Sequence, residues 1–356
     1  MTTTYKDVVL SPAADGATVA FTGTGQDEHV TFANPHQYLF NIDLSLNGGD
    51  DQVTEQAFDL LGARVGLGAG ADSASLVTIG DLTVSGGSGD DDLSVGSVNG
   101  AVDAWAGPGD DHVSASASSG AVVHGGAGDD WILADGSGGD SPGIAYGGPG
   151  NDYLEVRGQT ILADSGPGDD VITGGTGYGA DIHGGSGDDT VVVGGGGLVD
   201  GGDGDDTIYM TNVGVEEDRE AFSGGRGNDT VRYTGFDTTL TVRMDGGLGT
   251  DLLYAGPMHD ELHFVPADTP AGAGRDVVHG FVHGQDHLAL DGDADVTRGG
   301  VQHYAFVGQT RDPGPGQVGY HVAGGDTVVD GFDGRTHFEI QLEHLAGHLD
   351  ASDFIA

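Results

Sequence analysis

Short stretches in which apolar and polar residues alternate recur along this chain at intervals of about twenty residues. Clear examples are GGAGDDWIL at 125–133, GGSGDDTVV at 184–192 and GGRGNDTVR at 224–232, where the alternation follows a glycine-rich segment. Alternation with a period of two is the pattern of a β-strand that buries one face. We therefore predict a short strand after each glycine-rich segment, with the following residues facing the core: Val53, Leu93, Val113, Ile132, Leu154, Ile172, Val191, Ile208, Val231 and Leu253.

A second apolar run precedes the glycines of the next repeat, as in AVVH at 121–124 and GIAY at 143–146. Each repeat thus predicts a strand, a variable loop, a second strand and a glycine turn. A period near twenty residues is the length of one solenoid coil, and stacked coils pair in parallel sheets. We predict an all-β protein, a right-handed parallel β-roll or β-helix solenoid of about twelve coils with a C-terminal β cap.

The glycine turns follow the pattern G-G-x-G-x-D-x-U-x, in which U is apolar, and seven of them carry both leading glycines. The first three turns are degraded. Successive sixth-position aspartates are separated by 17 to 24 residues, and they are Asp27, Asp51, Asp72, Asp91, Asp111, Asp130, Asp152, Asp170, Asp189, Asp206, Asp229 and Asp251.

Composition narrows the classes of function. With 57 acidic residues against 11 Lys plus Arg, the net charge is −46, which excludes nucleic acid as a partner. A salt-adapted acidic surface is one explanation of this charge, but it leaves the fixed places of the aspartates unexplained. The absence of cysteine excludes disulfides and thiolate metal sites. We also predict no membrane span and no Sec-type signal, because no long apolar stretch occurs.

Stacked coils would place one carboxylate per coil along an edge, about 5 Å apart, and such a column repels itself unless cations lie between the turns. Calcium accepts six to eight carboxylate and carbonyl oxygens in irregular geometry, whereas Mg²⁺ requires a stricter octahedron. The glycines allow positive φ values, so that carbonyls can turn inward. The sequence therefore predicts a row of calcium sites.

The nonapeptide resembles the calcium-binding repeat of the repeat-in-toxin (RTX) family over about residues 20–255. The resemblance implies roughly eight to eleven Ca²⁺ ions between successive glycine turns, held by the sixth-position aspartates and by carbonyls near positions one to four. Nonapeptides stand on one edge only, so we expect a single row of ions, with GGTGYGAD at 174–181 as a further candidate. The glycines that would contribute are Gly86, Gly89, Gly125, Gly128, Gly147, Gly150, Gly184, Gly187, Gly201, Gly204, Gly224 and Gly227.

After residue 255 glycine becomes rarer and ten of the fifteen histidines appear. This part resembles the C-terminal domain of serralysin-type proteases, which implies a cap ending in an uncleaved type I secretion signal. We divide the chain into an N-terminal cap with a degraded coil (1–45), an RTX-like β-roll (46–255) and this cap (256–356). The expected partners are calcium and the type I secretion machinery, and the expected location is extracellular, where calcium would drive folding.

Catalytic alternatives rest on fewer residues. The HDELH segment at 259–263 has Glu261 at the third place, where neither zinc-protease pattern has it. Asp260 and Leu262 instead match a decayed repeat on a strand. His279, His283 and His287 recur every four residues, but intervening glycines argue against the helix that would align them as a metal site. A polysaccharide lyase or epimerase needs cationic groups for uronate carboxylates, and few are present.

Two rows of outward residues suggest binding. The seventh position holds His112, Trp131 and Tyr153 in three successive coils, rings that could dock sugars or simply pack together. Thr190, Thr207 and Thr230 form a similar row, typical of strands and also of ice-binding faces. We predict a secreted, non-catalytic calcium-binding repeat protein with a cell-surface or matrix role; the alternative is a glycan-active enzyme or a lectin that uses the ring-lined face.

Overall fold

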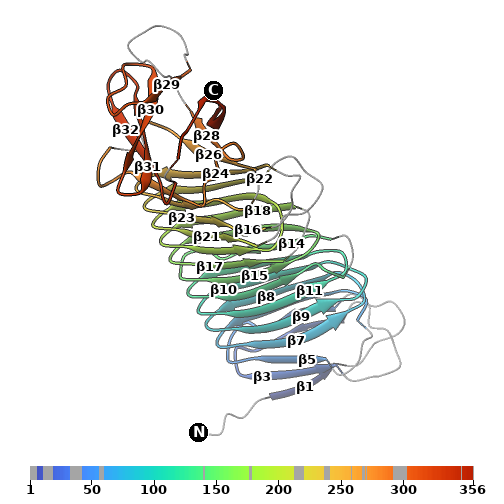
Figure 1. Ribbon diagram of the computed structural model, residues 1–356. Helices are drawn as coiled ribbons and strands as arrows, with labels where there is room; N and C mark the ends of the chain where they lie inside the picture. The colour runs from blue at the N-terminus through green and yellow to red at the C-terminus, as the bar shows by residue number, and fades with distance from the viewer. Residues whose placement is uncertain are drawn as a thin grey trace. The chain divides into compact units, whose positions relative to one another are not determined.

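The computed structural model describes residues 6–10, 19–32, 42–55, 60–138, 141–175, 179–211, 220–235, 241–257, 259–266, 269, 271–291, 303–345 and 347–355. The predicted fold class is confirmed, because parallel sheets form a β-solenoid of about eleven turns, close to the twelve expected. Two compact units divide at residues 182 and 183: Met1–Ile182 and His183–Ala356. Figure 1 shows how the strands of successive coils lie side by side within each unit.

The first unit has two parallel sheets, one formed by odd-numbered strands (sheet A) and one by even-numbered strands (sheet B). Sheet A contains β1 (Lys6–Leu10), β3 (Glu28–Phe32), β5 (Gln52–Glu55), β7 (Ser73–Thr78), β9 (Asp92–Ser97), β11 (His112–Ala117), β13 (Trp131–Asp135), β15 (Tyr153–Arg157) and β17 (Val171–Gly174). Sheet B contains β2 (Val19–Thr22), β4 (Ile42–Ser45), β6 (Ala63–Ala69), β8 (Leu82–Ser88), β10 (Val102–Pro108), β12 (Ala121–Ala127), β14 (Gly143–Tyr146) and β16 (Thr160–Pro167). The unit boundary falls within β18 (Gly179–Ser186).

Each coil consists of a sheet B strand, a glycine turn, a sheet A strand and a variable loop, as the sequence predicts. The register keeps equivalent positions in line, for example Val113 opposite Ile132 and Ile132 opposite Leu154. These side chains are fully buried, as is Val123 in sheet B. Burying an aliphatic side chain of this size contributes roughly 1.5–3 kcal/mol to folding. The aliphatic core between the two sheets is therefore built one layer per coil.

The second unit repeats this arrangement and then changes it. Parallel pairing continues past residue 255, where the sequence predicts the end of the roll, through β26, β27 and β28. The parallel strands of this unit are β19 (Thr190–Val193), β21 (Thr207–Met210), β23 (Thr230–Tyr233), β25 (Leu252–Tyr254) and β27 (Asp276–His279) in sheet A, and β20 (Gly197–Asp203), β22 (Glu220–Arg226), β24 (Thr241–Leu248), β26 (His259–Phe264), β28 (His287–Leu290) and β33 (Phe354–Ile355) in sheet B.

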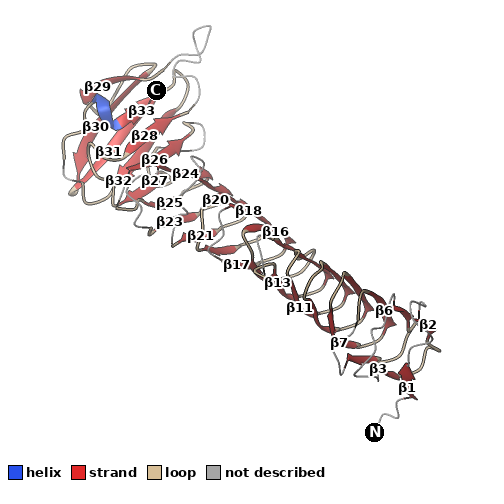
Figure 2. Ribbon diagram, turned by 90° about the vertical axis from the view of Figure 1, so that its right-hand side faces the viewer, coloured by secondary structure: helices blue, strands red, loops and turns tan. Residues whose placement is uncertain are grey.

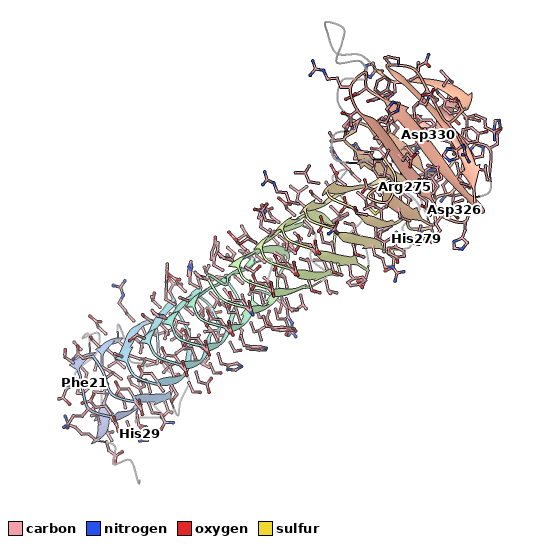
Figure 3. All side chains as sticks on the ribbon, turned by 90° about the vertical axis from the view of Figure 1, so that its left-hand side faces the viewer. Phe21, His29, Arg275, His279, Asp326 and Asp330 are labelled. Atoms are coloured by element: carbon pink, nitrogen blue, oxygen red, sulfur yellow. The ribbon has the colours of Figure 1, made fainter. Side chains whose placement is uncertain are left out.

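The remaining strands extend sheet A beyond β27 in a different topology. β30 (Gln317–Ala323), β31 (Asp326–Phe332) and β32 (His337–Leu342) pair antiparallel, β32 pairs parallel with β27, and β29 (Ala305–Gln309) pairs parallel with β30. The short helix η1 (Ala351–Asp353) is drawn in blue in Figure 2. Asp326 and Asp330 lie in this antiparallel part (Figure 3), where His321 contacts Asp330 at 2.6 Å. The last parallel strand of an open solenoid would expose an unpaired sheet edge. Here β32 pairs with β27 and covers that edge.

Candidate metal centre

The glycine turns bring one carboxylate per coil into the protein interior. In a typical turn, β12 ends at Ala127, β13 begins at Trp131, and Asp130 between them is only 3 % exposed. We call these buried acids the inner column. It consists of Glu28, Asp51, Asp72, Asp91, Asp111, Asp130, Asp152 and Asp170 in the first unit, and of Asp189, Asp206, Asp229, Asp251 and Asp276 in the second.

Each inner acid is tied to its neighbour by a backbone hydrogen bond. The N–H of Asp111 donates to Oδ1 of Asp130 at 2.9 Å, and the N–H of Asp130 donates to Oδ1 of Asp152 at 2.8 Å. Equivalent bonds measure 2.6–2.9 Å along each unit. In every case the acceptor belongs to the later coil, so the carboxylates are oriented by the turn that precedes them.

The second oxygen of these carboxylates is different. Among the described residues, the following buried oxygens have no hydrogen-bond partner: Oε2 of Glu28 and Oδ2 of Asp51, Asp72, Asp91, Asp111, Asp130, Asp152, Asp206 and Asp229. A buried acceptor without a partner is costly, and a buried charge is costlier still. The same cost is repeated in coil after coil, which makes this position the candidate metal centre.

The first glycine of each turn leaves room for that oxygen. A Cβ added at Gly125 would lie 2.4 Å from Oδ2 of Asp130 and 2.7 Å from the carbonyl oxygen of Gly147 in the next coil. The same convergence of carboxylate and carbonyl oxygens occurs at Gly86, Gly147, Gly184, Gly201 and Gly224. Carboxylate and carbonyl oxygens are the ligands that calcium prefers. In these turns a glycine leaves both oxygens uncovered, whereas Ala106 and Ser165 occupy the same place in the turns of Asp111 and Asp170.

The glycine at the fourth position of the nonapeptide has a positive φ, as the sequence predicts. Gly128 has φ +132°, and a Cβ there would lie 2.1 Å from the carbonyl oxygen of Gly109 in the preceding coil. Successive turns therefore approach one another at backbone distance. The equivalent positive-φ glycines are Gly89, Gly150, Gly187, Gly204 and Gly227.

Burial changes the acidity of the inner column. Desolvation raises the pKa of Asp130 to about 7, the neighbouring Asp152 and Asp111 charges add to this rise, and the N–H of Asp111 opposes it. Burial likewise raises the pKa of Asp229 to about 8. The pKa rises to about 7 for Asp51, Asp91, Asp152 and Asp276 and to about 6 for Asp72, Asp111 and Asp206, with burial as the largest cause. Burial therefore opposes ionisation of these carboxyls, most strongly at Asp229.

A second row of carboxylates and amides, which the sequence reasoning missed, lies beside the inner one at the fifth position of the nonapeptide. We call it the outer column: Asp27, Asp50, Asp90, Asp110, Asp129, Asn151 and Asp169 in the first unit, and Asp188, Asp205 and Asn228 in the second. Here the direction of the hydrogen bonds is reversed, since the N–H of Asp129 donates to Oδ1 of Asp110 in the earlier coil at 2.9 Å. The recurring GDD and GND triplets are the signal that could have revealed it.

The structure corrects the place of Asp27. His29 is opposite Gln52 in the register, so Glu28 is the partner of Asp51 and takes the inner position. The N–H of Glu28 donates to Oδ1 of Asp51 at 2.7 Å, whereas Oδ1 of Asp27 accepts from the outer residue Asp50. The prediction was shifted by one residue because it sought an aspartate where the buried acid is a glutamate.

The structure also adds Asp276 to the inner column. It is 1 % exposed and accepts a hydrogen bond from the N–H of Asp251 at 2.9 Å. The segment GAGRDVV at 272–278 keeps the second and fourth glycines and the sixth aspartate of the repeat, a signal that sequence reasoning passed over. The further candidate at 174–181 includes residues 176–178, which lie outside the described residues.

Buried acids also lie in the second unit outside the inner column, where the chain enters sheet B: Asp260, Asp286 and Asp353. Asp260 receives the N–H of Gly256 at 2.7 Å, and its own N–H donates to Oδ1 of Asp286 at 3.1 Å. Burial, followed by the charge of Asp286, raises the pKa of Asp260 to about 7. Asp260 and Leu262 are buried on β26, so the expected strand is confirmed for HDELH.

The histidines of the second unit contact separate partners. His279, labelled in Figure 3, stacks on Tyr254 at 4.5 Å, and His283 contacts Asp353 at 2.8 Å. His287 lies on β28. The described parts of the chain contain no group of three His, Asp or Glu side chains placed to hold a metal by themselves. A cation at the inner column would therefore need backbone carbonyls as well.

The predicted ring row on sheet A exists. His112, Trp131 and Tyr153 are register partners on β11, β13 and β15, with ring centroids 4.4 Å and 6.1 Å apart and nearly parallel planes. Thr190, Thr207 and Thr230 form the other predicted row. Because each ring covers the face of the next, the stack presents ring edges to solvent.

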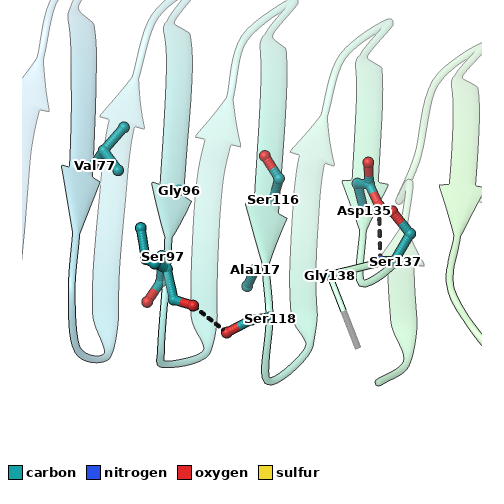
Figure 4. Close-up of a pocket in the computed structure, with 10 residues that line it drawn as sticks. Val77, Gly96, Ser97, Ser116, Ala117, Ser118, Asp135, Ser137 and Gly138 are labelled. Atoms are coloured by element: carbon teal, nitrogen blue, oxygen red, sulfur yellow. Dashed lines mark hydrogen bonds between the residues drawn. The ribbon is translucent and has the colours of Figure 1, made fainter. Parts of the chain in front are cut away.

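Near the variable loops, the outer face of sheet A also carries a shallow polar cavity of about 430 Å³ (Figure 4). Small residues such as Gly96, Ser116 and Ser118 line it, and Asp135 is its only acidic lining residue among those described. The N–H of Ser137 donates to this carboxylate at 2.8 Å. The cavity results from missing side-chain volume and does not gather a catalytic set of residues.

Comparison with known proteins finds no family model and no curated protein that matches this sequence. Within the residues described, no helix has both the length and the apolar character needed to cross a membrane. The geometry of the columns and sheet faces is therefore the basis for assigning a function.

Proposed function

We propose that this chain is a calcium-binding β-solenoid of the RTX type, in which Ca²⁺ ions lie between successive glycine turns at the inner column. The observation that carries the proposal is the repeated buried carboxylate oxygen without a hydrogen-bond partner, as in Asp91, Asp111 and Asp130. A divalent cation would satisfy these oxygens and cancel the repulsion between neighbouring carboxylates. The carbonyl oxygens that converge on the same glycines supply further ligands of the type calcium accepts.

Calcium binding would couple to folding. Where metal binds the folded chain and not the unfolded one, its binding free energy stabilises the fold. A chain of net charge −46 would remain extended at low calcium and fold where calcium is abundant. We propose a secreted protein with a structural or adhesive role at the cell surface or in the matrix, exported by type I machinery. The serralysin-like C-terminal part is the basis of the export proposal.

The test is a calcium titration of protein stripped of metal at low ionic strength. We expect far-ultraviolet circular dichroism to gain β-signal as Ca²⁺ is added, and native mass spectrometry to count roughly eight to eleven ions. Equimolar Mg²⁺ is the matched control and should restore much less signal, because it demands a stricter octahedron. Full β-signal in the stripped protein would contradict the proposal.

A further inference from the structure

A second stack of rings, absent from the sequence predictions, lies on the outer face of sheet B in the first unit. Trp105, His124 and Tyr146 are register partners on β10, β12 and β14. The Trp105 and His124 rings are 3.6 Å apart with planes at 12°, and the His124 and Tyr146 rings are 4.8 Å apart at 11°. His124 therefore has both faces covered, and only the end rings can offer an open face.

Trp105 is the end ring with an open face. On its other side β10 pairs with β8, where the register partner of Trp105 is Ser85, and the partner of Ser85 on β6 is Gly66. Neither residue has a side chain large enough to cover an indole ring. The exposed fraction of Trp105 is 47 %, high for so large an apolar residue. The indole thus stands beside a strip of the sheet face that carries only small residues, Ser85 and Gly66, which we call the slot.

A polar row borders this slot. Two residues earlier on β10, β8 and β6, and in line with them on β4, are Asp103, Thr83, Arg64 and Asp43, which are register partners. A cavity of about 450 Å³ lies over the β4–β8 part of this row, with Asp43, Arg64, Thr83 and the nearby Asp81 in its lining. The row offers carboxylate acceptors, guanidinium donors and a hydroxyl that does both. An aromatic face beside mixed donors and acceptors suits a ligand that is apolar on one face and rich in hydroxyls at its edge.

We propose that Trp105 and the Asp43–Arg64–Thr83–Asp103 row form a binding site for neutral polysaccharide, with a pyranose ring packed on the open face of the indole. Small convergent sets of polar groups around an apolar surface are typical of ligand sites. Arg64, whose neighbours in the row are Asp43 and Thr83, adds a positive charge that disfavours an organic cation, and the net charge of −46 disfavours uronates and sulfated sugars. The site is independent of the proposed calcium ladder.

The ring row on sheet A is a natural comparison. Its end ring His112 is held by Asp92, whose Oδ1 lies 3.1 Å from the imidazole Nδ1. Trp131 stacks against a ring on either side. The chain contains only these two tryptophans, one with an open face and one without. A lectin site is therefore expected on sheet B and not on the sheet A face that the sequence favoured.

The experiment uses the full-length folded protein, with its fold checked by circular dichroism. In Trp131→Phe the only indole is Trp105, and we expect its fluorescence to shift with at least one of cellohexaose, mannohexaose or laminarihexaose. Calorimetry on single variants should show at least tenfold weaker binding in Trp105→Ala, and in Ser85→Tyr, which keeps the indole but extends the stack over its face. Trp131→Phe should bind as the parent does.

Three results would overturn the proposal. One is the absence of binding by all three oligosaccharides at millimolar concentration. Another is unchanged affinity in Ser85→Tyr, which would show that sugar binds away from the open face. The third is a choline-induced shift of Trp105 fluorescence that displaces the sugar, which would assign the slot to cations. All three outcomes can be read whether or not the protein binds calcium.

Discussion

The inner and outer columns place acidic residues one position apart along the same turns, but they differ in cost. Among the residues described, the inner column buries carboxylate oxygens that have no hydrogen-bond partner. Asp129 and Asp130 are adjacent, and each carboxylate accepts a hydrogen bond from the backbone of a neighbouring coil, Asp129 from the later coil and Asp130 from the earlier one. Asp129 is exposed, whereas Asp130 is buried with a second oxygen unpartnered. Burial, together with this reversal of hydrogen-bond direction, therefore distinguishes a surface acid from a candidate metal ligand.

The two columns also differ in what they tolerate. The outer column includes asparagine at positions 151 and 228, so an uncharged amide can continue its ladder. Apart from Glu28, every member of the inner column is an aspartate. The outer column needs only a hydrogen-bond acceptor at each turn, and the amide oxygen of Asn provides one. A site that needs a negative charge, as proposed for the inner column, cannot use Asn.

The largest expected effect is a reversal of the pH dependence of stability by calcium. Without metal, the raised pKa of groups such as Asp130, about 7 against 3.8 unfolded, means that the folded state binds more protons between about pH 4 and 7. Stability of the metal-free fold should then fall as pH rises through this window. With Ca²⁺, stability should rise over the same window, because protons compete with the metal for the carboxylates.

Thermal unfolding followed by circular dichroism at pH 5, 6, 7 and 8, with chelator and with calcium, measures both slopes. Added NaCl at equal ionic strength controls for screening of the surface charges. Parallel slopes in the two series would show that the inner column is not where the metal acts.

A glycine substitution should have the next largest effect. Gly126 has φ +131°, and a Cβ there would lie 1.8 Å from the carbonyl oxygen of Gly107. Gly126→Ala should lower the free energy of unfolding by about 3 kcal/mol, because it combines overpacking with a strained φ. Chemical denaturation in saturating calcium measures this. Gly179→Ala is the matched control, since nothing lies within 4 Å of a Cβ there; equal losses in both variants would contradict the close approach of the turns.

The smallest expected effect compares the two columns directly. Asp130→Asn should lower stability in calcium by about 1–3 kcal/mol through loss of ion binding, yet raise it in chelator, because a buried amide avoids the cost of a buried charge. Asp129→Asn, the neighbouring outer residue, should stay within about 0.5 kcal/mol in both conditions. Unfolding midpoints with and without calcium test this. A loss in chelator for Asp130→Asn would mean that the residue serves packing only.

Much of the fold could be predicted because equivalent positions of successive repeats are aligned in the sheets. The apolar residue two places after each aspartate had to face the core, and Ile132 and Leu154 do so. The place of Glu28 could not be read from the motif, because a longer acid can reach the same position from a degraded turn. The Trp105 stack was also missed. Trp105, His124 and Tyr146 each stand six residues before the aspartate of their turn, but this position carries no fixed residue type, since other coils hold Ser85, Asp164 or Ser223 there.

Glu28 determines how the array of coils begins. Its Oε1 accepts the N–H of Thr24 in its own turn at 2.9 Å, whereas Oδ1 of each later acid accepts from the coil before it. The inner column therefore closes on itself at this rung. Sheet A continues one strand further, because β1 pairs parallel with β3, so β1 and not Glu28 forms the described edge that faces a neighbouring molecule.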